Sequence, residues 1–294
     1  MLLGGHKKAH TCKIQLVLAA VVLLLLQWRS IVHHTNAFRR DLLSKPDDSP
    51  WSSLDHLIIV AGHAVLVTHD ALTRDTVNRD DIWALEPFQH GQVSTFVSHI
   101  RRGIHEAASD PKALLLFSGG ETRKAAGPRS EAQSYWEVAD AIRWDNKARV
   151  RDRALTEEHA HDSFENVLFS LCRFREVTGR YPRRLTVIGF SFKEHRFSNL
   201  HRAALRFPKE RFRYIGIDPP GGVGQDVRDG ERRNSASLFG DDPYGCSDAS
   251  LVRKRAARNP FRSSPSYPRF CPELADIFDY CSKDIFPGAL PWSA

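Results

Sequence analysis

A short apolar run that stops at Ser-Gly-Gly constrains the fold of this chain more than any other stretch. The run at 114–117 is Leu-Leu-Leu-Phe, and Ser118, Gly119 and Gly120 follow it directly. In a parallel sheet, a buried strand delivers the chain in this way to the carboxyl edge, where open α/β folds bind their ligands. The stretch therefore predicts both a fold class and the position of a site.

Three further apolar runs have the length of buried strands and lie at 57–60, 185–190 and 214–217. Amphipathic segments with helical spacing separate them, and the clearest contains Val93, Phe96, Val97, Ile100 and Ile104. Alternation of this kind favours a parallel sheet with right-handed crossovers. We predict a Rossmann-like, three-layer α/β domain over residues 56–220, followed by a C-terminal extension over 221–294. Residues 64–90 look irregular, with Trp83 and Phe88 as packing anchors.

Two predicted helices begin close to the expected site. Ser130 can cap a helix whose first turn holds Glu131. Asp162 stands three residues before Glu165 in a capping-box pattern, and Gly179 ends that helix. The capping box alone would explain Glu165, without any ligand.

We expect the carboxyl edge to form a pocket for a phosphate-bearing anion. Glycine lets backbone N–H groups approach an anion closely, and a Lys or Arg side chain would complete a clamp. Two carboxylates could hold a divalent ion or act as acid and base. The candidate catalytic residues are Glu131 and Glu165, and the candidate ligand-binding residues are Gly62, Ser118, Gly119, Gly120, Asn166, Lys193 and Arg196.

Each of these features also has a purely structural interpretation. Ser-Gly-Gly can be only a tight turn, and Lys193 and Arg196 can be a solvated face. His159 and His161 have no third ligand near them in the sequence, so no metal site is predicted. The chain carries no P-loop, no GxGxxG after a strand and no GxSxG elbow. Their absence disfavours a standard NTPase, a dinucleotide enzyme and an α/β-hydrolase.

The formal net charge of +7 and the pI near 9.3 favour anionic partners. The excess is spread along the chain without a nucleic-acid-binding signature, so specific nucleic acid binding is not expected. The five cysteines form no CxxC pair, and a single bridge among Cys246, Cys271 and Cys281 is one possibility.

The N-terminal region predicts attachment to a membrane. A polar stretch at 1–13 precedes an apolar segment at 14–32, which is close to the minimum length for a spanning helix. We expect a single-pass signal-anchor there, joined to the domain by a linker over 33–55. A cleaved signal peptide or a buried helix of a soluble protein are the alternatives. Basic residues flank the segment on both sides, so the side of the membrane is left open.

The ordered set of motifs resembles the DUF218 (SanA/YdcF-like) domain family, most closely its fungal transmembrane branch. The set consists of Ser118-Gly119-Gly120, Ser130-Glu131-Ala132, Glu158, Ser163-Phe164-Glu165-Asn166, and Arg196 after a strand. The resemblance covers about residues 56–220. It implies a Rossmann-like fold with a polar pocket at the carboxyl edge, and no agreed reaction.

Two departures from the family pattern concern the site. Only Gly62 stands before His63 where the family has a Gly-rich turn, and Lys193 stands where relatives commonly have the histidine of His-x-x-Arg. A lysine there is a point charge at neutral pH rather than a proton shuttle.

Two functions therefore stay open from the sequence. One is a membrane-anchored hydrolase or transferase acting on an anionic metabolite. The other is a non-catalytic module that binds a nucleotide or S-adenosylmethionine, or a scaffold whose pocket is vestigial. The sequence does not identify a cofactor.

Overall fold

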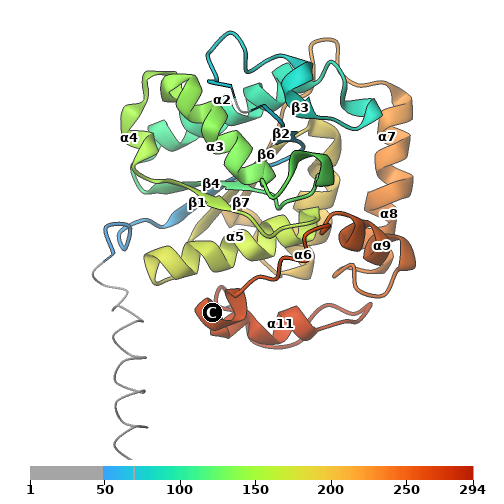
Figure 1. Cartoon of the computed structure of the whole chain (residues 1–294). Helices are drawn as coiled ribbons and strands as arrows, with labels where there is room; N and C mark the ends of the chain where they lie inside the picture. Colours follow the sequence, from blue (N-terminus) through green and yellow to red (C-terminus); the bar gives the residue numbers. More distant parts are fainter. Residues whose placement is uncertain (1–48, 69, 294) are drawn as a thin grey trace, which may run out of the picture. The chain divides into compact units, whose positions relative to one another are not determined.

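The computed structural model describes residues 49–68 and 70–293 (Figure 1). The predicted signal-anchor at 14–32, its polar flank and most of the linker lie outside these residues. Among the described residues, no helix is both long and apolar enough to cross a membrane.

Five parallel strands form the central sheet, in the order β5-β4-β1-β6-β7. Leu57 of β1 pairs with Leu114 of β4 on one side and with Leu185 of β6 on the other. The chain thus runs outward from β1 to β5, then returns to the other side of β1. Ligands of open α/β sheets bind outside the carboxyl ends of the strands at such a reversal. The strands are β1 (His56–Ala61), β4 (Ala113–Ser118), β5 (Ala154–Glu157), β6 (Arg184–Gly189) and β7 (Phe212–Gly216).

Alternate side chains of the strands enter two separate apolar cores, one on each face of the sheet. Ile58 and Val60 pack in the core that includes residues of α2 (Val93–Ser109) and α3 (Glu131–Ala141). Leu57 and Ile59 pack in the core that includes α5 (Ser163–Thr178). Figure 1 shows α2 and α3 on one side of the sheet and α5 on the other. The expected parallel α/β fold with helical layers is therefore observed.

The two helix caps and the glycine stop predicted from the sequence are confirmed, but the Glu165 side chain does not bond to the Asp162 N–H as a capping box requires. The Oγ of Ser130 accepts a hydrogen bond from the Gln133 N–H at 2.8 Å, at the start of α3. Asp162 accepts from the N–H groups of Phe164 and Glu165 at 2.9 Å each, and Gly179 ends α5 with a φ of 77°.

Two sequence expectations differ from the structure. Strand β5 was not predicted, because Ala-Leu-Thr-Glu contains no apolar run. Phe88 is 70% exposed, so it is not a packing anchor, whereas Trp83 is buried as expected. Residues 64–90 include a small antiparallel ribbon of β2 (Val65–Leu66) and β3 (Trp83–Ala84).

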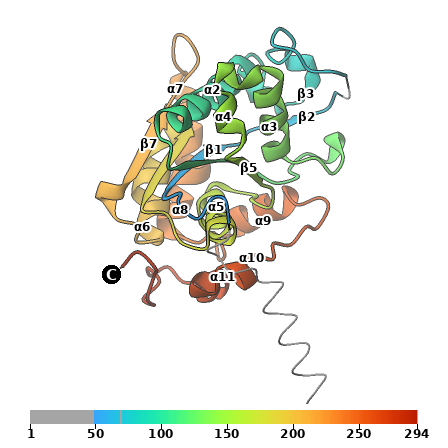
Figure 2. The same cartoon turned by 90° about the vertical axis from the view of Figure 1, so that its left-hand side faces the viewer.

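The C-terminal extension packs on the domain rather than trailing from it. Phe239, Leu251, Tyr267 and Trp292 share the apolar core of α5. Figure 2 shows α9, α10 and α11 gathered on the α5 side of the sheet. The helices of the extension are α7 (Gln225–Glu231), α8 (Ser237–Asp241), α9 (Ala249–Ala257), α10 (Tyr267–Phe270) and α11 (Ala275–Asp279).

Short helices complete the described fold. Those in the domain are α4 (Ala148–Arg151), α6 (Arg202–Ala204), and one-turn segments η2 (Asp80–Ile82), η3 (Pro87–Gln89), η4 (Lys124–Ala126), η5 (Arg143–Asn146), η6 (Ser191–Lys193) and η8 (Lys209–Arg211). The π-helical turns are η7 (Arg196–His201) and η9 (Arg232–Ala236), and η10 (Pro272–Leu274) precedes α11.

Two disulfides involve the C-terminal extension, and one of them links it to α5. Cys172 of α5 bonds to Cys271 after α10, across a sequence separation of 99. Cys246 bonds to Cys281, across a separation of 35, which is a bridge of the kind left open by the sequence. The first bridge was not predicted, because Cys172 lies within the apolar face of a helix.

We expect the longer bridge to contribute more to stability than the shorter one. Loop-closure entropy gives about 4.7 kcal/mol for the loop closed by Cys172 and Cys271 and about 3.8 kcal/mol for the other. Urea unfolding of the paired Cys172→Ser/Cys271→Ser and Cys246→Ser/Cys281→Ser variants measures both. If both variants unfold at the wild-type urea concentration, the bridges do not form.

Candidate functional site

Glu131 lies against the two glycines that end the central strands. A Cβ on Gly62 would stand 2.6 Å from the Cβ of Glu131, and one on Gly119 would stand 2.6 Å from its Oε2. The φ of Gly119 is +155°, which also disfavours a side chain there. The Glu131 side chain is nearly buried and accepts a hydrogen bond from the Thr122 hydroxyl. The structure therefore brings Gly62, Gly119 and Glu131 together at the ends of β1 and β4.

Gly62, Gly119 and Gly120 allow close packing at the strand ends, and their backbone N–H groups bond to other parts of the protein. The N–H of Gly62 donates to the Ser118 carbonyl at 2.8 Å, that of Gly119 to Glu157 at 3.0 Å, and that of Gly120 to Ala160 at 2.7 Å. The three glycine N–H groups that the sequence predicts as anion donors are thus already bonded to backbone carbonyls. An anion bound at this edge cannot use these three N–H groups.

Ser118 belongs to a buried network and does not face solvent. Its hydroxyl donates to Oε2 of Glu157 at 2.6 Å and lies 2.9 Å from Oδ1 of Asn166. Glu157 also accepts from the Tyr267 hydroxyl at 3.2 Å. Burial raises the pKa of Glu157 to about 7, so its proton is exchangeable near neutrality. Sequence reasoning missed Glu157, because nothing marked β5 as a strand.

Glu165 anchors the C-terminal extension. Its Oε1 lies 3.0 Å from Nε of Arg255, and its Oε2 accepts from the His161 N–H at 2.8 Å. Arg255 also pairs with the helix cap Asp162 at 2.6 Å. Glu165 thus binds a backbone N–H near the helix start, as a capping role requires, but on His161 and not on the cap residue. With its charge paired, it is poorly placed for acid–base chemistry.

Lys193 is the most unusual charged group at the edge. Its Nζ lies 3.4 Å from Nδ1 of His63 and 5.3 Å from the centre of the Phe190 ring. Burial, and then the positive charge of Arg196, lower the pKa of Lys193 to about 7. The sequence predicts a fixed point charge at this position. In the structure, the Lys193 side chain can instead exchange a proton at neutral pH.

The neutral His63 ring packs beside the Lys193 ammonium group. Its ring stacks on Phe190 at a centroid distance of 4.9 Å and is 6% exposed. Burial and the Lys193 charge hold the pKa of His63 well below its usual value, so the imidazole is neutral. Its Nε2 is buried without a hydrogen-bond partner in the described residues.

Arg196 is held in place by protein partners. Its Nε lies 2.8 Å from Oε1 of Glu231, and its Nη1 donates to the Ser163 hydroxyl at 2.9 Å. The side chain is buried, and Glu231 comes from α7 in the extension. Such a pair can orient a ligand, but most of the Arg196 charge is already offset.

The extension brings a further cation to the same edge. Arg258 follows α9, is exposed, and donates from Nη1 to the His161 carbonyl at 3.3 Å. Its charge contributes to the low pKa of Lys193, whereas Glu131 and Glu231 oppose that effect. The charges of Arg196, Arg258, Glu231 and Glu131 all influence the pKa of Lys193, which follows β6 at the reversal between β1 and β6.

The predicted site residues thus divide into three groups along one edge. The first group consists of Gly62, Gly119 and Glu131, with Gly120 next to Gly119 in the same loop. Beside this group lie Lys193 and Arg196. Ser118 and Asn166 form a buried second group, and Glu165 pairs away from both. Within residues 49–68 and 70–293, no group of three or more His, Cys, Asp or Glu could hold a metal ion.

Comparison with known proteins identifies one relative by sequence. The chain is 31% identical over 297 aligned positions to the uncharacterized protein YOR238W of Saccharomyces cerevisiae. The alignment covers 81% of this chain and 97% of the yeast protein. No protein-family model matches the chain, and no solved structure does.

We expect Gly62→Ala to destabilise the protein by about 1–3 kcal/mol, because the new methyl group would overlap the Glu131 side chain. Gly240→Ala is the matched control, since its added Cβ would meet open space within α8. The control should change stability by less than about 1 kcal/mol. Urea unfolding measures both variants, and equal unfolding free energies would contradict the packing of Glu131 on Gly62.

Proposed function

We propose that this chain, which belongs to the family of the yeast protein YOR238W, binds a phosphate-bearing anionic metabolite at the carboxyl edge of its sheet. The observation that carries the proposal is the setting of Lys193. A lysine with a pKa of about 7 lies near enough to the buried Glu131 carboxylate for that charge to influence it, where the strand order reverses. This combination of a proton-exchanging cation and a positioned carboxylate is typical of a site for acid–base chemistry.

The side chains suggest a division of roles. Lys193 and Arg258 would attract and hold the anion, with Arg196 oriented beside them by Glu231. Glu131 would accept a proton from the attacking water or hydroxyl, and the Lys193 ammonium would return one to the leaving oxygen. The reaction class is hydrolysis or transfer of the phosphate-bearing group.

The resemblance to the DUF218 domain family supports the same location. Its motif residues Glu131, Asn166 and Arg196 lie along one edge of the sheet. In this interpretation Lys193 replaces the family's histidine with a group of similar proton affinity, because burial lowers its pKa. The departure noted from the sequence is then a substitution that keeps the chemistry.

A non-catalytic module for a nucleotide or S-adenosylmethionine is the second candidate. The pairing of Glu165 with Arg255 and of Arg196 with Glu231 favours it. A carboxylate paired with an arginine is held in its ionised form, and an arginine does not exchange protons near neutral pH, so neither pair favours acid–base chemistry.

We propose that residues 14–32 anchor the protein in a membrane, with the domain on the oxidising side. Two disulfides support that side, because such bridges persist in secretory compartments and are rare in the cytosol.

Sulfate tests the anion site, because it stays fully ionised across the neutral range. We expect wild-type affinity to rise by about tenfold or more between about pH 8 and pH 6, as Lys193 gains its proton. Arg196 and Arg258 keep their charges over that range. Calorimetric titration of the full-length chain in detergent measures the affinity.

The matched variants separate charge from packing. Lys193→Arg is always charged and should bind tightly with no pH dependence in this range, whereas Lys193→Met should bind weakly at every pH. A wild-type affinity that does not change with pH would contradict the role of Lys193. Turnover assays on phosphate esters that bind then distinguish an enzyme from a binding module.

Protease protection tests the membrane arrangement. In sealed microsomes, a tag at the C-terminus should resist protease until detergent is added, because the domain would lie inside. Carbonate extraction should leave the protein in the pellet. Digestion of the tag without detergent would place the domain on the cytosolic side, and release by carbonate would contradict the anchor.

A further inference from the structure

A pocket lies beside the carboxyl end of β5, on the far side of the Ser-Gly-Gly loop from Lys193. Its volume is about 410 Å³, which suits a small organic ligand. Sheet-edge residues form one wall, and the 263–270 segment of the extension forms the other. The pocket shares no lining residue with the Lys193 site.

One end of the pocket carries uncompensated negative charge. Glu158 accepts hydrogen bonds from the hydroxyls of Thr156 at 2.7 Å and Ser130 at 3.0 Å, which are neutral donors. Glu121 has no ion-pair or hydrogen-bond partner among the described residues. The third carboxylate of the lining, Glu176, is neutralised by Arg173 at 2.6 Å.

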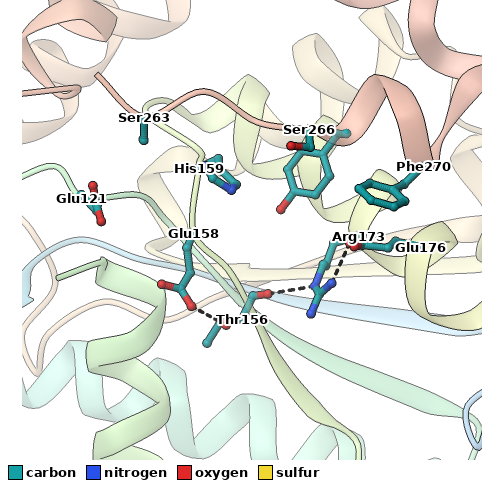
Figure 3. Close-up of a pocket in the computed structure, with 10 residues that line it drawn as sticks. Glu121, Thr156, Glu158, His159, Arg173, Glu176, Ser263, Ser266 and Phe270 are labelled. Carbon is teal, nitrogen blue, oxygen red and sulfur yellow. Dashed lines mark hydrogen bonds and ion pairs between the residues drawn. The ribbon is translucent and has the colours of Figure 1, made fainter. Parts of the chain in front are cut away.

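The other end holds aromatic rings beside the paired Arg173 and Glu176. Tyr267 and Phe270 of α10 line it, and Tyr267 is fixed by its hydroxyl bond to Glu157. The His159 ring meets Tyr267 edge-on at 5.6 Å, and its Nδ1 is buried without a partner. In Figure 3, Glu121 and Glu158 lie toward one end, Phe270 toward the other, and His159 between them.

We propose that this pocket binds a primary ammonium group attached to a flat apolar body. The ammonium would lie between Glu121 and Glu158, where charge-assisted hydrogen bonds are strong. The apolar body would pack on Phe270 and Tyr267.

Two observations favour an organic cation over a metal ion. No group of three or more metal-ligating side chains occurs in the part of the chain that the structure describes. The aromatic end also offers a surface that a bare ion would not use. The Arg173 guanidinium near that end disfavours a second positive charge on the ligand.

Phenethylamine is the probe, because its ammonium and its ring match the two ends. Its neutral and anionic counterparts, 2-phenylethanol and phenylacetate, have nearly the same shape. Calorimetric titration of the full-length chain at pH 7 should show the amine binding at least about tenfold more tightly than the alcohol, and no binding of the acid. Equal affinities for amine and alcohol would overturn the proposal.

Three single-charge variants locate the binding. Glu121→Gln and Glu158→Gln should each weaken the amine by about tenfold and leave the alcohol unchanged. Glutamine at 158 keeps an acceptor for the Ser130 and Thr156 hydroxyls, and thermal unfolding without ligand checks the fold. Glu210→Gln, an exposed change in η8, should have no effect. An equal loss in Glu210→Gln, or no loss in either pocket variant, would contradict the site.

This test is independent of the anion site. Lys193→Met should leave phenethylamine affinity at the wild-type value, because Lys193 does not line the pocket. A large loss in that variant would show that the amine binds at the carboxyl edge instead, and would overturn the assignment.

Discussion

The hydrogen bonds to Glu157 hold together the parts of this molecule on which both candidate sites depend. The carboxyl group lies at the end of β5 and accepts from Ser118 of β4, from the His159 N–H and from Tyr267 of α10. Through Ser118 the network reaches Asn166 of α5. A single buried carboxyl thus joins the sheet edge, the capped helix and the extension. Because it is fully buried, each of these bonds offsets part of a large desolvation cost.

The sequence predicted the parts of the fold that local patterns determine. Four of the five central strands, the caps at Ser130 and Asp162 and the stop at Gly179 follow from apolar periodicity and cap chemistry. Strand β5 could not be predicted from the sequence, because an edge strand of four residues needs no continuous apolar run. The prediction that Phe88 packs in the core is wrong, because a hydrophobic residue type alone does not show which side chains of an irregular segment are buried.

The candidate site was predictable in position and less so in chemistry. Strand ends correctly placed Gly62, Gly119 and Glu131 on one edge. The partners of Arg196 and Glu165 could not be foreseen, because Glu231 and Arg255 come from an extension whose contacts no periodicity reveals. The same limit applies to Lys193. Its proton affinity depends on burial and on charges that include Arg258 of the extension, and the approach of Arg258 and His63 from distant segments is specified only by the folded structure.

The bridge between Cys172 and Cys271 also has a consequence for biosynthesis. Ninety-nine positions separate its two cysteines, so at a synthesis rate of about 5–20 residues per second Cys172 waits about 5–20 s for its partner. During that interval the α5 face of the sheet lacks Tyr267 and Trp292, which complete its core. The nascent domain therefore exposes an apolar surface and a free thiol, and would benefit from a chaperone and a thiol oxidase at the site of synthesis.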